Sequence, residues 1–450
     1  AAAAPGQGAD AAIRNLPKNM LKTLIEAISS VVNKQTDRQA RIAGFGRLLT
    51  PLATTLQAVL NQLKARPGAN STPLSADNRN VVATTLDCMH MVIRHVDVST
   101  NQNQHGNAPT APPGAEHPII TALRQLWPMF DQVLSLASAD AVVVEKLFAV
   151  NKHVIRRVGP HAAQTVLSPI LGHAMQVYAR QASSPAIYML RVCISDLAHT
   201  SPDAAAKLVQ AFRQLVEITC SKYLMNLKQM REQPDVVDDF FLLCNRVLKS
   251  KSPAVVACFA DPEILGRCVH LGAMGLLQDH SDALVSVLTF FERLLYSTKD
   301  SGGGGGASAR RAAIMNCMMQ VGGIFMENLV LGVAGETPRR YVAHGDITLS
   351  HVVFELGAFD LNVLTQLLKY ALGKLDVSYA SDVEKQTFGA NLLQTFSNAQ
   401  PVAVKSASHM RRGVENVVGD FSKLARGNRE KARRKEMARK KSIEARQRGA

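Results

Sequence analysis

The sequence predicts an all-α protein, an α-solenoid (superhelix) of HEAT- or armadillo-type antiparallel helix pairs. Three observations favour it. Ala and Leu dominate the 450 residues while aromatic residues are only 5%. Apolar residues recur three or four positions apart between the loops, and strict strand-like alternation is rare. A two-helix unit recurs roughly every 40–45 residues between positions 119 and 300, which predicts about 8 pairs. Each pair buries its apolar faces only against its neighbours.

Segments rich in Gly, Pro, Asn and Ser divide the chain. They predict a disordered N-terminus at 1–12 and a solenoid at 13–427. They also predict loops at 65–78, 99–118 and 298–309, and a basic tail at 428–450. The pentaglycine 302–306 is not followed by the Lys-Ser/Thr pair of a phosphate-binding loop, so we expect a flexible linker there.

Individual helices follow from apolar spacing and from proline. Residues 119–134, 238–249 and 283–296 each carry apolar residues on one helical face. Pro128 is expected to kink the first of these helices or to end a turn. Further prolines predict breaks between helices at positions 160, 185, 202, 234, 253 and 262.

Composition excludes several classes of protein. The seven cysteines are odd in number and form no CxxC, which indicates a reduced, intracellular protein without disulfides or a zinc site. The N-terminus has no apolar core of a signal peptide, and we expect no membrane span. His90, His95, His344 and His351 do not match zinc-ligand spacing. We therefore expect no metal and no cofactor.

The sequence gives no sign of an enzyme. GxSxG and HExxH motifs are absent from it. Asp235, Asp238 and Asp239 form an acidic cluster at an expected helix start. Carboxylates there more often cap the helix and complement its dipole than act as an acid/base pair.

One stretch, 140–159, carries a sharper signal. On a helical wheel its apolar side consists of Val143, Leu147, Val150, Val154 and Val158. The other side carries Lys146, Lys152, Arg156 and Arg157, together with His153. Such a basic side is either an ordinary solvated surface or a site that binds an acidic or phosphorylated partner. Arg suits phosphate because its planar fork donates two parallel hydrogen bonds.

The net charge of +15 is concentrated at the C-terminus, where residues 423–450 hold 12 Lys/Arg and 3 Asp/Glu. This tail has helix-forming residues and i,i+4 pairs such as Glu436 and Lys440. Three interpretations remain open: a solvated, mostly disordered tail, a nuclear-localisation-like run, and an arm that binds nucleic acid or an acidic partner.

Several stretches together resemble the carboxyl-terminal half of transportin-3-type β-karyopherins, the importin-13-like family. The resemblance is collinear over about 80–427 and lies in 117–134, 142–159, 166–190, 234–253 (PDVVDDFFLLCNRVLKSKSP), 276–295 and 417–427 (VVGDFSKLARG).

The resemblance implies a HEAT-repeat receptor that shuttles between cytoplasm and nucleus, contacts nucleoporins and releases cargo on Ran-GTP. It implies Ser/Arg-rich, often phosphorylated, cargo. Lys146, Lys152 and Arg156 occupy basic positions of the family's cargo-binding helix, Ala149 stands where the family has Arg, and Arg157 is an additional cation. The resemblance does not include the family's amino-terminal repeats, which hold most of the Ran-binding surface, so we expect these repeats to be missing here.

Two alternatives to a Ser/Arg-cargo receptor remain open. One is an importin-13-like receptor for folded cargo. The other is a HEAT scaffold whose basic tail, 428–450, binds RNA or ribonucleoprotein.

Overall fold

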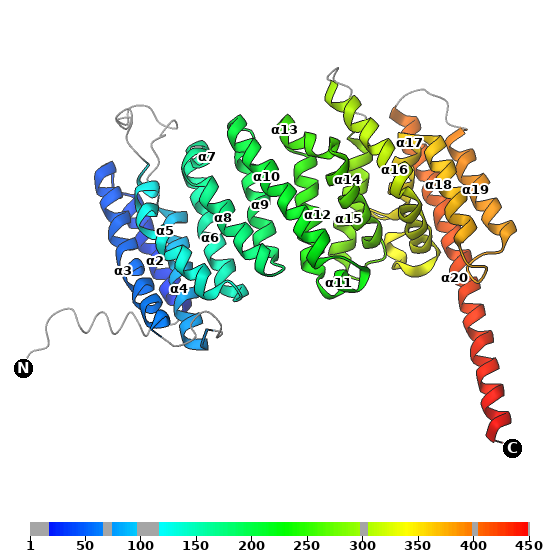
Figure 1. Cartoon of the computed structure of the whole chain (residues 1–450), viewed down its shortest axis with the longest axis horizontal. Coiled ribbons are helices and arrows are strands. Elements are labelled where there is room, and N and C mark those ends of the chain that lie inside the picture. The colour runs from blue at the N-terminus through cyan, green and yellow to red at the C-terminus, as the bar shows by residue number, and fades with distance from the viewer. Residues whose placement is uncertain (1–17, 66–73, 97–116, 298–304, 398–403, 449–450) are drawn as a thin grey trace, which may run out of the picture. The chain divides into compact units, whose positions relative to one another are not determined.

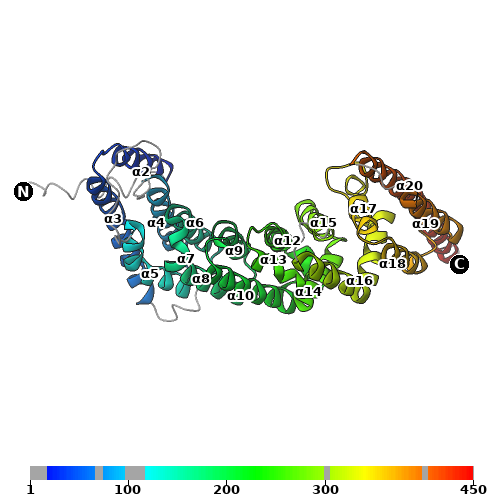
Figure 2. The ribbon, with the colours of Figure 1, turned by 90° about the horizontal axis from the view of Figure 1, so that it is seen from above.

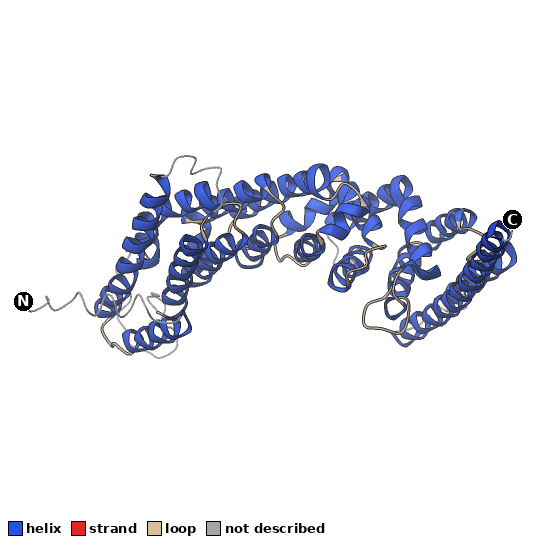
Figure 3. Cartoon of the chain, turned by 90° about the horizontal axis from the view of Figure 1, so that it is seen from below, coloured by secondary structure: helices blue, strands red, loops and turns tan. Residues whose placement is uncertain are grey.

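The computed structural model describes residues 18–65, 74–96, 117–297, 305–397 and 404–448. Regular structure in these ranges is helical throughout, with no strand among them (Figure 3). The predicted all-α class is therefore confirmed. The predicted N-terminal segment 1–12 and most of the three predicted loops lie outside the described residues.

The chain divides into two compact units, with the boundary between Ala211 and Phe212. This boundary lies inside helix α10, Pro202–Ile218. We call the N-terminal part unit 1 and the C-terminal part unit 2. A single solenoid domain over 13–427 remains a prediction.

Unit 1 is built from two layers of helices (Figures 1 and 2). Helices α2, α4, α6 and α9 lie side by side in one layer, and α3, α5 and α8 form the other. The pairs α3/α4, α5/α6 and α8/α9 join the layers. The helices are α2 (Lys18–Asn33), α3 (Arg38–Lys64), α4 (Ala76–His95), α5 (Pro118–Ala137), α6 (Ala141–Val158), α7 (Ala162–Thr165), α8 (Leu167–Arg180) and α9 (Ser184–Leu197).

Unit 2 repeats this two-layer arrangement. Helices α12, α15, α17 and α20 pack in sequence as one layer, α14, α16 and α18 form the other, and α19 packs on α18 and α20. The helices are α11 (Leu227–Glu232), α12 (Pro234–Leu248), α13 (Pro253–Val256), α14 (Pro262–Gly275), α15 (Ser281–Tyr296), α16 (Gly305–Leu331), α17 (Leu349–Phe359), α18 (Leu361–Lys374), α19 (Asp382–Ser397) and α20 (Val404–Arg448). Short π-helical turns, Thr219–Tyr223 and Gly332–Glu336, and 3₁₀ turns connect them.

Helix starts follow local chemistry. Prolines occupy the first turn of α5, α9, α12 and α14, where their missing N–H costs nothing. The prolines of α9, α12 and α14 lie at predicted breaks. Pro128 lies inside α5, which continues to Ala137. Asp140 caps α6 by accepting hydrogen bonds from the amides of Val142 and Val143, at 3.2 and 3.3 Å.

The acidic cluster at the start of α12 behaves differently from the prediction. The N-cap residue of α12 is Gln233, and no side chain caps this helix end. Asp235 lies in the first turn, where its charge complements the helix dipole. Asp238 instead accepts a hydrogen bond from the Ser286 hydroxyl, which ties α12 to α15. Capping is therefore wrong for Asp238, because this residue lies in the second turn of α12 and its carboxylate bonds to α15.

The core of unit 2 contains a run of phenylalanine rings. Phe240, Phe241, Phe290, Phe291 and Phe325 are fully buried. Successive rings along this order have centroids 4.5–5.3 Å apart in tilted or edge-on arrangements, which aromatic pairs favour. These rings join α12, α15 and α16.

Helix α16 is unusually long and apolar, which the expectation of no membrane span did not foresee. The stretch Ser308–Glu336 is long enough and apolar enough to cross a membrane, by length and composition alone. It packs against both α14 and α18, and 56% of its most apolar window is buried. This apolar surface is typical of a core helix with neighbours on two sides.

Candidate functional site

Helix α6 buries the apolar side predicted for it. Val143, Leu147, Val150 and Val154 are 0% exposed and Val158 is 4% exposed. The cations of the opposite side therefore lie on the outer surface of the layer α4–α6–α9, away from the α5 layer. Lys146, Lys152 and Arg157 are partly exposed and Arg156 is exposed. The structure thus brings all four predicted site residues onto one surface.

Two of these cations pair with carboxylates of the neighbouring helices. Lys146 Nζ lies 3.5 Å from Asp87 Oδ1 on α4, and Asp87 also pairs with Lys22 of α2 at 2.6 Å. Arg156 Nε lies 3.5 Å from Asp196 Oδ2 on α9. The positive charge of α6 is therefore partly balanced within its own layer.

The other two predicted residues contact uncharged groups. Arg157 donates a hydrogen bond to the carbonyl oxygen of Arg94 at the end of α4. Lys152 Nζ lies 5.7 Å from the ring centre of Tyr188 on α9, and the Arg191 guanidinium lies 4.8 Å from the same ring. Tyr188 thereby holds two cations near each other, since the face of an aromatic ring attracts positive charge.

A pair of histidines lies between α4 and α6. The rings of His90 and His153 have centroids 4.5 Å apart. Burial, followed by the repulsion of nearby Lys152, lowers the pKa of His90 to about 4, although Asp87 opposes the shift. Burial first, and then His90 and Lys152, lower the pKa of His153 to about 3. Both imidazoles are therefore neutral at pH 7, and lysine and arginine alone carry the positive charge.

We call this region the α6 basic surface. It consists of Arg94 from α4, Lys146, Lys152, Arg156 and Arg157 from α6, and Arg191 from α9, with Asp87 and Asp196 among them. Partly exposed ion pairs like these contribute only about 0–1 kcal/mol. A phosphoryl group that brings about −1.5 to −2 charge can therefore displace a carboxylate from Lys146 or Arg156.

Sequence reasoning found the four cations but missed their neighbours. Asp87, His90, Tyr188, Arg191 and Asp196 come from α4 and α9, which lie tens of residues away in the sequence. Their types and spacing carried no local signal, because only the packing of α4 and α9 against α6 brings them to this surface.

Outside the α6 basic surface, metal-ligand clusters and reactive thiols are the groups that would point to a metal site or to catalysis. Within them, no group of three or more His, Cys, Asp or Glu side chains is arranged to hold a metal ion. All seven cysteines are reduced, and six of them are buried. Burial raises the pKa of Cys88 and Cys258 to about 11, which keeps these thiols protonated and poorly nucleophilic.

Comparison with known proteins identifies relatives of this fold and sequence. Residues 117–223, which include α6 and α9, match the model of the transportin-3/importin-13 fourth TPR domain. Importin-13 of Gallus gallus is 22% identical over 366 residues, which cover 80% of this chain and 34% of the relative. Transportin MOS14 of Arabidopsis thaliana is 24% identical over 177 residues, covering 39% of this chain and 18% of the relative.

Solved structures agree on the fold. The structure of importin-13 in its cytosolic state matches with a TM-score of 0.69 at 12% sequence identity. The match covers 92% of this chain and 41% of that chain. The chain thus spans about a third of the length of the importin-13 sequences that it matches. The predicted α-solenoid fold is confirmed. Residues 117–223 match the transportin-3/importin-13 family model, and the wider chain is similar to importin-13.

Proposed function

We propose that this chain is the cargo-binding region of a nuclear import receptor, and that the α6 basic surface binds Ser/Arg-rich proteins whose serines are phosphorylated. The observation that carries the proposal is a row of partly or fully exposed cations between α4 and α9, namely Lys146, Lys152, Arg156 and Arg157. Release by Ran-GTP, contact with nucleoporins and shuttling between cytoplasm and nucleus are parts of the proposal that rest on the family.

The spacing of the cations suits a repeating phosphorylated tract. At a rise of 1.5 Å per residue, Lys146 and Lys152 are about 9 Å apart along α6, and Lys152 and Arg156 about 6 Å. An extended Ser/Arg dipeptide repeats every ~7 Å. Successive phosphoserines of one tract can therefore face successive cations of α6.

The mixed charge of the surface suits the arginines of the same tract. Asp87 and Asp196 lie beside Lys146 and Arg156 at 3.5 Å. When phosphates occupy the cations, these carboxylates are released to pair with cargo arginines. A cargo with alternating phosphoserine and arginine would thus replace the ion pairs within the surface by two sets, phosphate with cation and carboxylate with arginine. A uniformly acidic peptide would instead place negative charge next to Asp87 and Asp196.

The residue types set the kind of recognition. Arg156 and Arg157 can each donate two parallel hydrogen bonds to one phosphate, while Lys146 and Lys152 act as point charges. Ala149 contributes no charge where the family has arginine. We therefore expect phosphate recognition that depends on total charge more than on bidentate geometry.

A second candidate is an importin-13-like receptor for folded cargo. Two observations favour it: the alignment with importin-13 covers 80% of this chain, against 39% for transportin MOS14, and Asp87 and Asp196 offset part of the positive charge. Folded cargo would contact several helices at once and would depend little on phosphorylation.

A pull-down with a Ser/Arg-repeat domain, phosphorylated or not, separates these candidates. The variant Lys146→Glu/Lys152→Glu/Arg156→Glu should lose the phosphorylated domain. The matched control Arg47→Glu/Lys64→Glu/Arg124→Glu changes the same charge at exposed positions of α3 and α5, in the other layer, and should bind as the parent does. Equal binding by both variants, or binding of neither domain by the parent, would reject the proposed site.

A further inference from the structure

Helix α20 has two parts with different surroundings. In its first part Val414, Val418 and Ala425 are 0% exposed and Phe421 is 5% exposed, and these residues pack against α17 and α19. The Phe421 ring stacks on Phe388 of α19 with centroids 4.1 Å apart. This part belongs to the core of unit 2.

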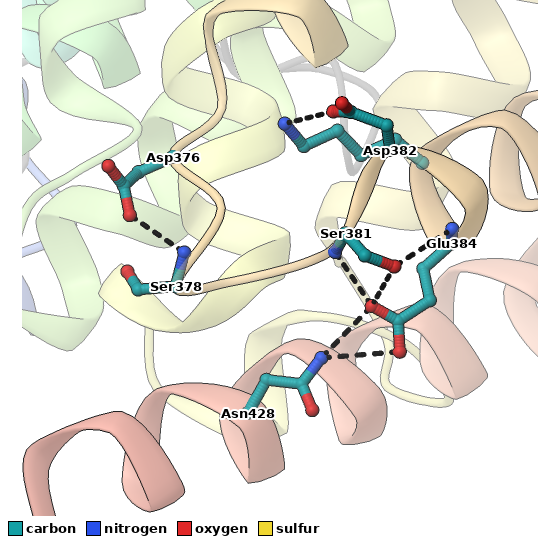
Figure 4. Close-up of polar contacts among 7 residues, drawn as sticks. Asp376, Ser378, Ser381, Asp382, Glu384 and Asn428 are labelled. Atoms are coloured by element: carbon teal, nitrogen blue, oxygen red, sulfur yellow. Dashed lines mark hydrogen bonds and ion pairs between the residues drawn. The ribbon is translucent and has the colours of Figure 1, made fainter. Parts of the chain in front are cut away.

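A network of polar contacts fixes the helix where it leaves this core. The Asn428 side-chain amide donates to Glu384 Oε2 at 3.2 Å (Figure 4). It also donates to the Tyr379 carbonyl oxygen at 3.2 Å. Glu384 also accepts from the amide and hydroxyl of Ser381 at 2.7 and 2.8 Å, which caps α19 (Figure 4). Arg429 pairs with Glu336 at 2.5 Å. The position and direction of the following residues are thus set by unit 2.

Beyond Arg429 the helix extends past the rest of unit 2 (Figure 1). We call residues 430–443 the projecting basic helix. Side chains from Arg433 to Lys441 are exposed throughout. Contacts between i and i+4 support the helix, because Glu430 pairs with Arg434, and Glu436 with Lys440 at 2.8 Å.

The cations of this helix surround its axis. Residues 430–443 contain seven cations and only two carboxylates, Glu430 and Glu436. The cations are Lys431, Arg433, Arg434, Lys435, Arg439, Lys440 and Lys441. At 100° per residue they fall into three groups around the axis, roughly 100–150° apart. A helix that docks on a flat partner needs one charged face, whereas this helix offers positive charge on nearly every side.

The positive region continues onto the body of unit 2. Arg426, Arg429 and Arg339 lie near one another at the root of the projecting basic helix. Burial lowers the pKa of Arg426, and the positive charges of Arg339 and Arg429 lower it further. Arg339 is exposed beside the turn Gly332–Glu336, on which α20 packs.

The chemistry of the helix excludes a lipid surface. An interfacial helix needs a continuous apolar face. The apolar side chains described beyond Arg433, apart from alanine, are Met437 and Ile443, which are 57% and 46% exposed and six residues apart. An acidic peptide would use one face and leave the cations of the other faces unmatched. A nucleic acid presents phosphates on both walls of a groove, and the major groove of B-DNA, about 12 Å wide, admits an α-helix.

We propose that the projecting basic helix, with Arg339 and Arg429 at its root, binds the phosphodiester backbone of nucleic acid through cations on several sides of the helix. The shared ligand chemistry is a row of phosphates, and duplex DNA, duplex RNA and single-stranded RNA are its sources. The contacts carry no base readout, so affinity depends on charge and salt and little on sequence.

The first test measures binding of the full chain to labelled duplex DNA, duplex RNA and single-stranded RNA over a salt series. If about five phosphates are neutralised on B-DNA, the logarithm of the binding constant should fall with a slope of about −4.5 against log salt, or about 500-fold between 50 and 200 mM. The strongest of the three probes identifies the source of the phosphates. No binding of any probe at about 50 mM salt would overturn the proposal.

Two variants test the involvement of several sides. Lys431→Gln/Lys435→Gln/Arg439→Gln and Arg433→Gln/Arg434→Gln/Lys440→Gln remove different sides of the charge and keep good helix-forming residues. Each should weaken binding at least 50-fold at about 100 mM salt and flatten the salt slope. The control Lys228→Gln/Lys249→Gln/Lys251→Gln removes three exposed cations elsewhere in unit 2 and should bind as the parent does.

Further outcomes would contradict the proposal. If only one of the two helix variants loses affinity, the helix uses a single face. If polyglutamate binds with the same affinity and salt dependence, the surface is one for acidic peptides. The Lys146→Glu/Lys152→Glu/Arg156→Glu variant should keep nucleic-acid binding, so failure of the proposed cargo site and failure of this inference are distinguished.

Discussion

The α6 basic surface and the projecting basic helix of α20 are both rich in Lys and Arg, but their surroundings differ. On α6 each predicted cation has a partner from a neighbouring helix: a carboxylate, a carbonyl oxygen or an aromatic ring. On α20 the ion pairs of residues 430–441 are with residues of the same helix.

Because of this difference, we expect α6 to select its ligand and α20 to attract any ligand with enough negative charge. A ligand of α6 must displace existing partners, so a match of shape and charge order decides binding. A ligand of α20 meets charges that are held mainly in water, so the number of its charges and the salt concentration decide binding. Net charge alone would not have distinguished the two regions.

Truncation of the chain after Arg429 should have the largest effect. It removes the projecting basic helix but leaves the buried contacts of Val414, Val418 and Phe421 in place. Binding of duplex nucleic acid should fall at least 100-fold in a fluorescence assay at about 100 mM salt, because the phosphate contacts are lost. The melting temperature should stay within about 1–2 °C of the parent. A large loss of stability would show that the helix packs elsewhere in the protein.

The double variant Asn428→Ala/Arg429→Ala tests whether these two residues anchor α20 to unit 2. It removes hydrogen bonds to Glu384 and Tyr379 and the ion pair with Glu336. We expect unit 2 to lose about 1–3 kcal/mol of unfolding free energy in urea denaturation, since Glu336 and Glu384 each lose a partner. Arg434→Ala, whose side chain is exposed, is the control and should cost less than ~0.5 kcal/mol. Equal effects of both variants would contradict the anchoring role.

Replacing the carboxylates of the α6 basic surface should have a smaller effect on affinity, and the effect should differ between two kinds of ligand. Asp87→Asn/Asp196→Asn frees Lys146 and Arg156 from their partners. Affinity for a short, purely acidic phosphopeptide should rise about 3- to 10-fold, because weak ion pairs of up to ~1 kcal/mol each no longer compete. Affinity for an alternating phosphoserine/arginine peptide should rise less or fall. Calorimetric titration of both peptides measures the difference, and an equal gain for both would contradict pairing of Asp87 and Asp196 with cargo arginines.

The histidine pair should give a pH dependence of stability. Unfolding returns the pKa of His90 and His153 from about 4 and about 3 to their ordinary value of 6.5. Between pH 6.5 and about 4 the unfolded chain therefore binds protons that the folded chain does not, so stability falls as pH falls. Melting curves of His90→Gln and His153→Gln should show a weaker decline over this range than the parent. His199→Gln, at an exposed position of unit 1, should decline as the parent does.

The sequence predicted the periodic features of the molecule well. The apolar side of α6 was right at all five positions, because one turn of 3.6 residues leaves a strong pattern over 18 residues. Proline positions located the starts of α9, α12 and α14. The i,i+4 pair of Glu436 and Lys440 was also right. The suggestion of a mostly disordered tail was wrong for residues 428–448, which continue α20 as helix.

Features that arise from packing between distant segments could not be predicted in this way. Tyr188, Asp87 and Asp196 reach the α6 basic surface only because α4 and α9 flank α6. Asp238 bonds to Ser286 of another helix and not to its own helix end. The hydrogen bonds of Asn428 likewise join segments about 44–49 residues apart in the sequence. Such pairs have no sequence period, so a single sequence holds no local pattern that reveals them.

The most direct test of the central claim is the affinity of this chain for one Ser/Arg-repeat peptide in phosphorylated and unphosphorylated form, measured for the parent and for Lys146→Glu/Lys152→Glu/Arg156→Glu. We predict that phosphorylation strengthens binding to the parent at least 10-fold and that the variant loses this gain, because three phosphate-facing cations become carboxylates. The Arg47→Glu/Lys64→Glu/Arg124→Glu control should retain the gain. Equal affinity for both peptide forms in the parent, or a gain preserved in the variant, would contradict cargo binding by α6.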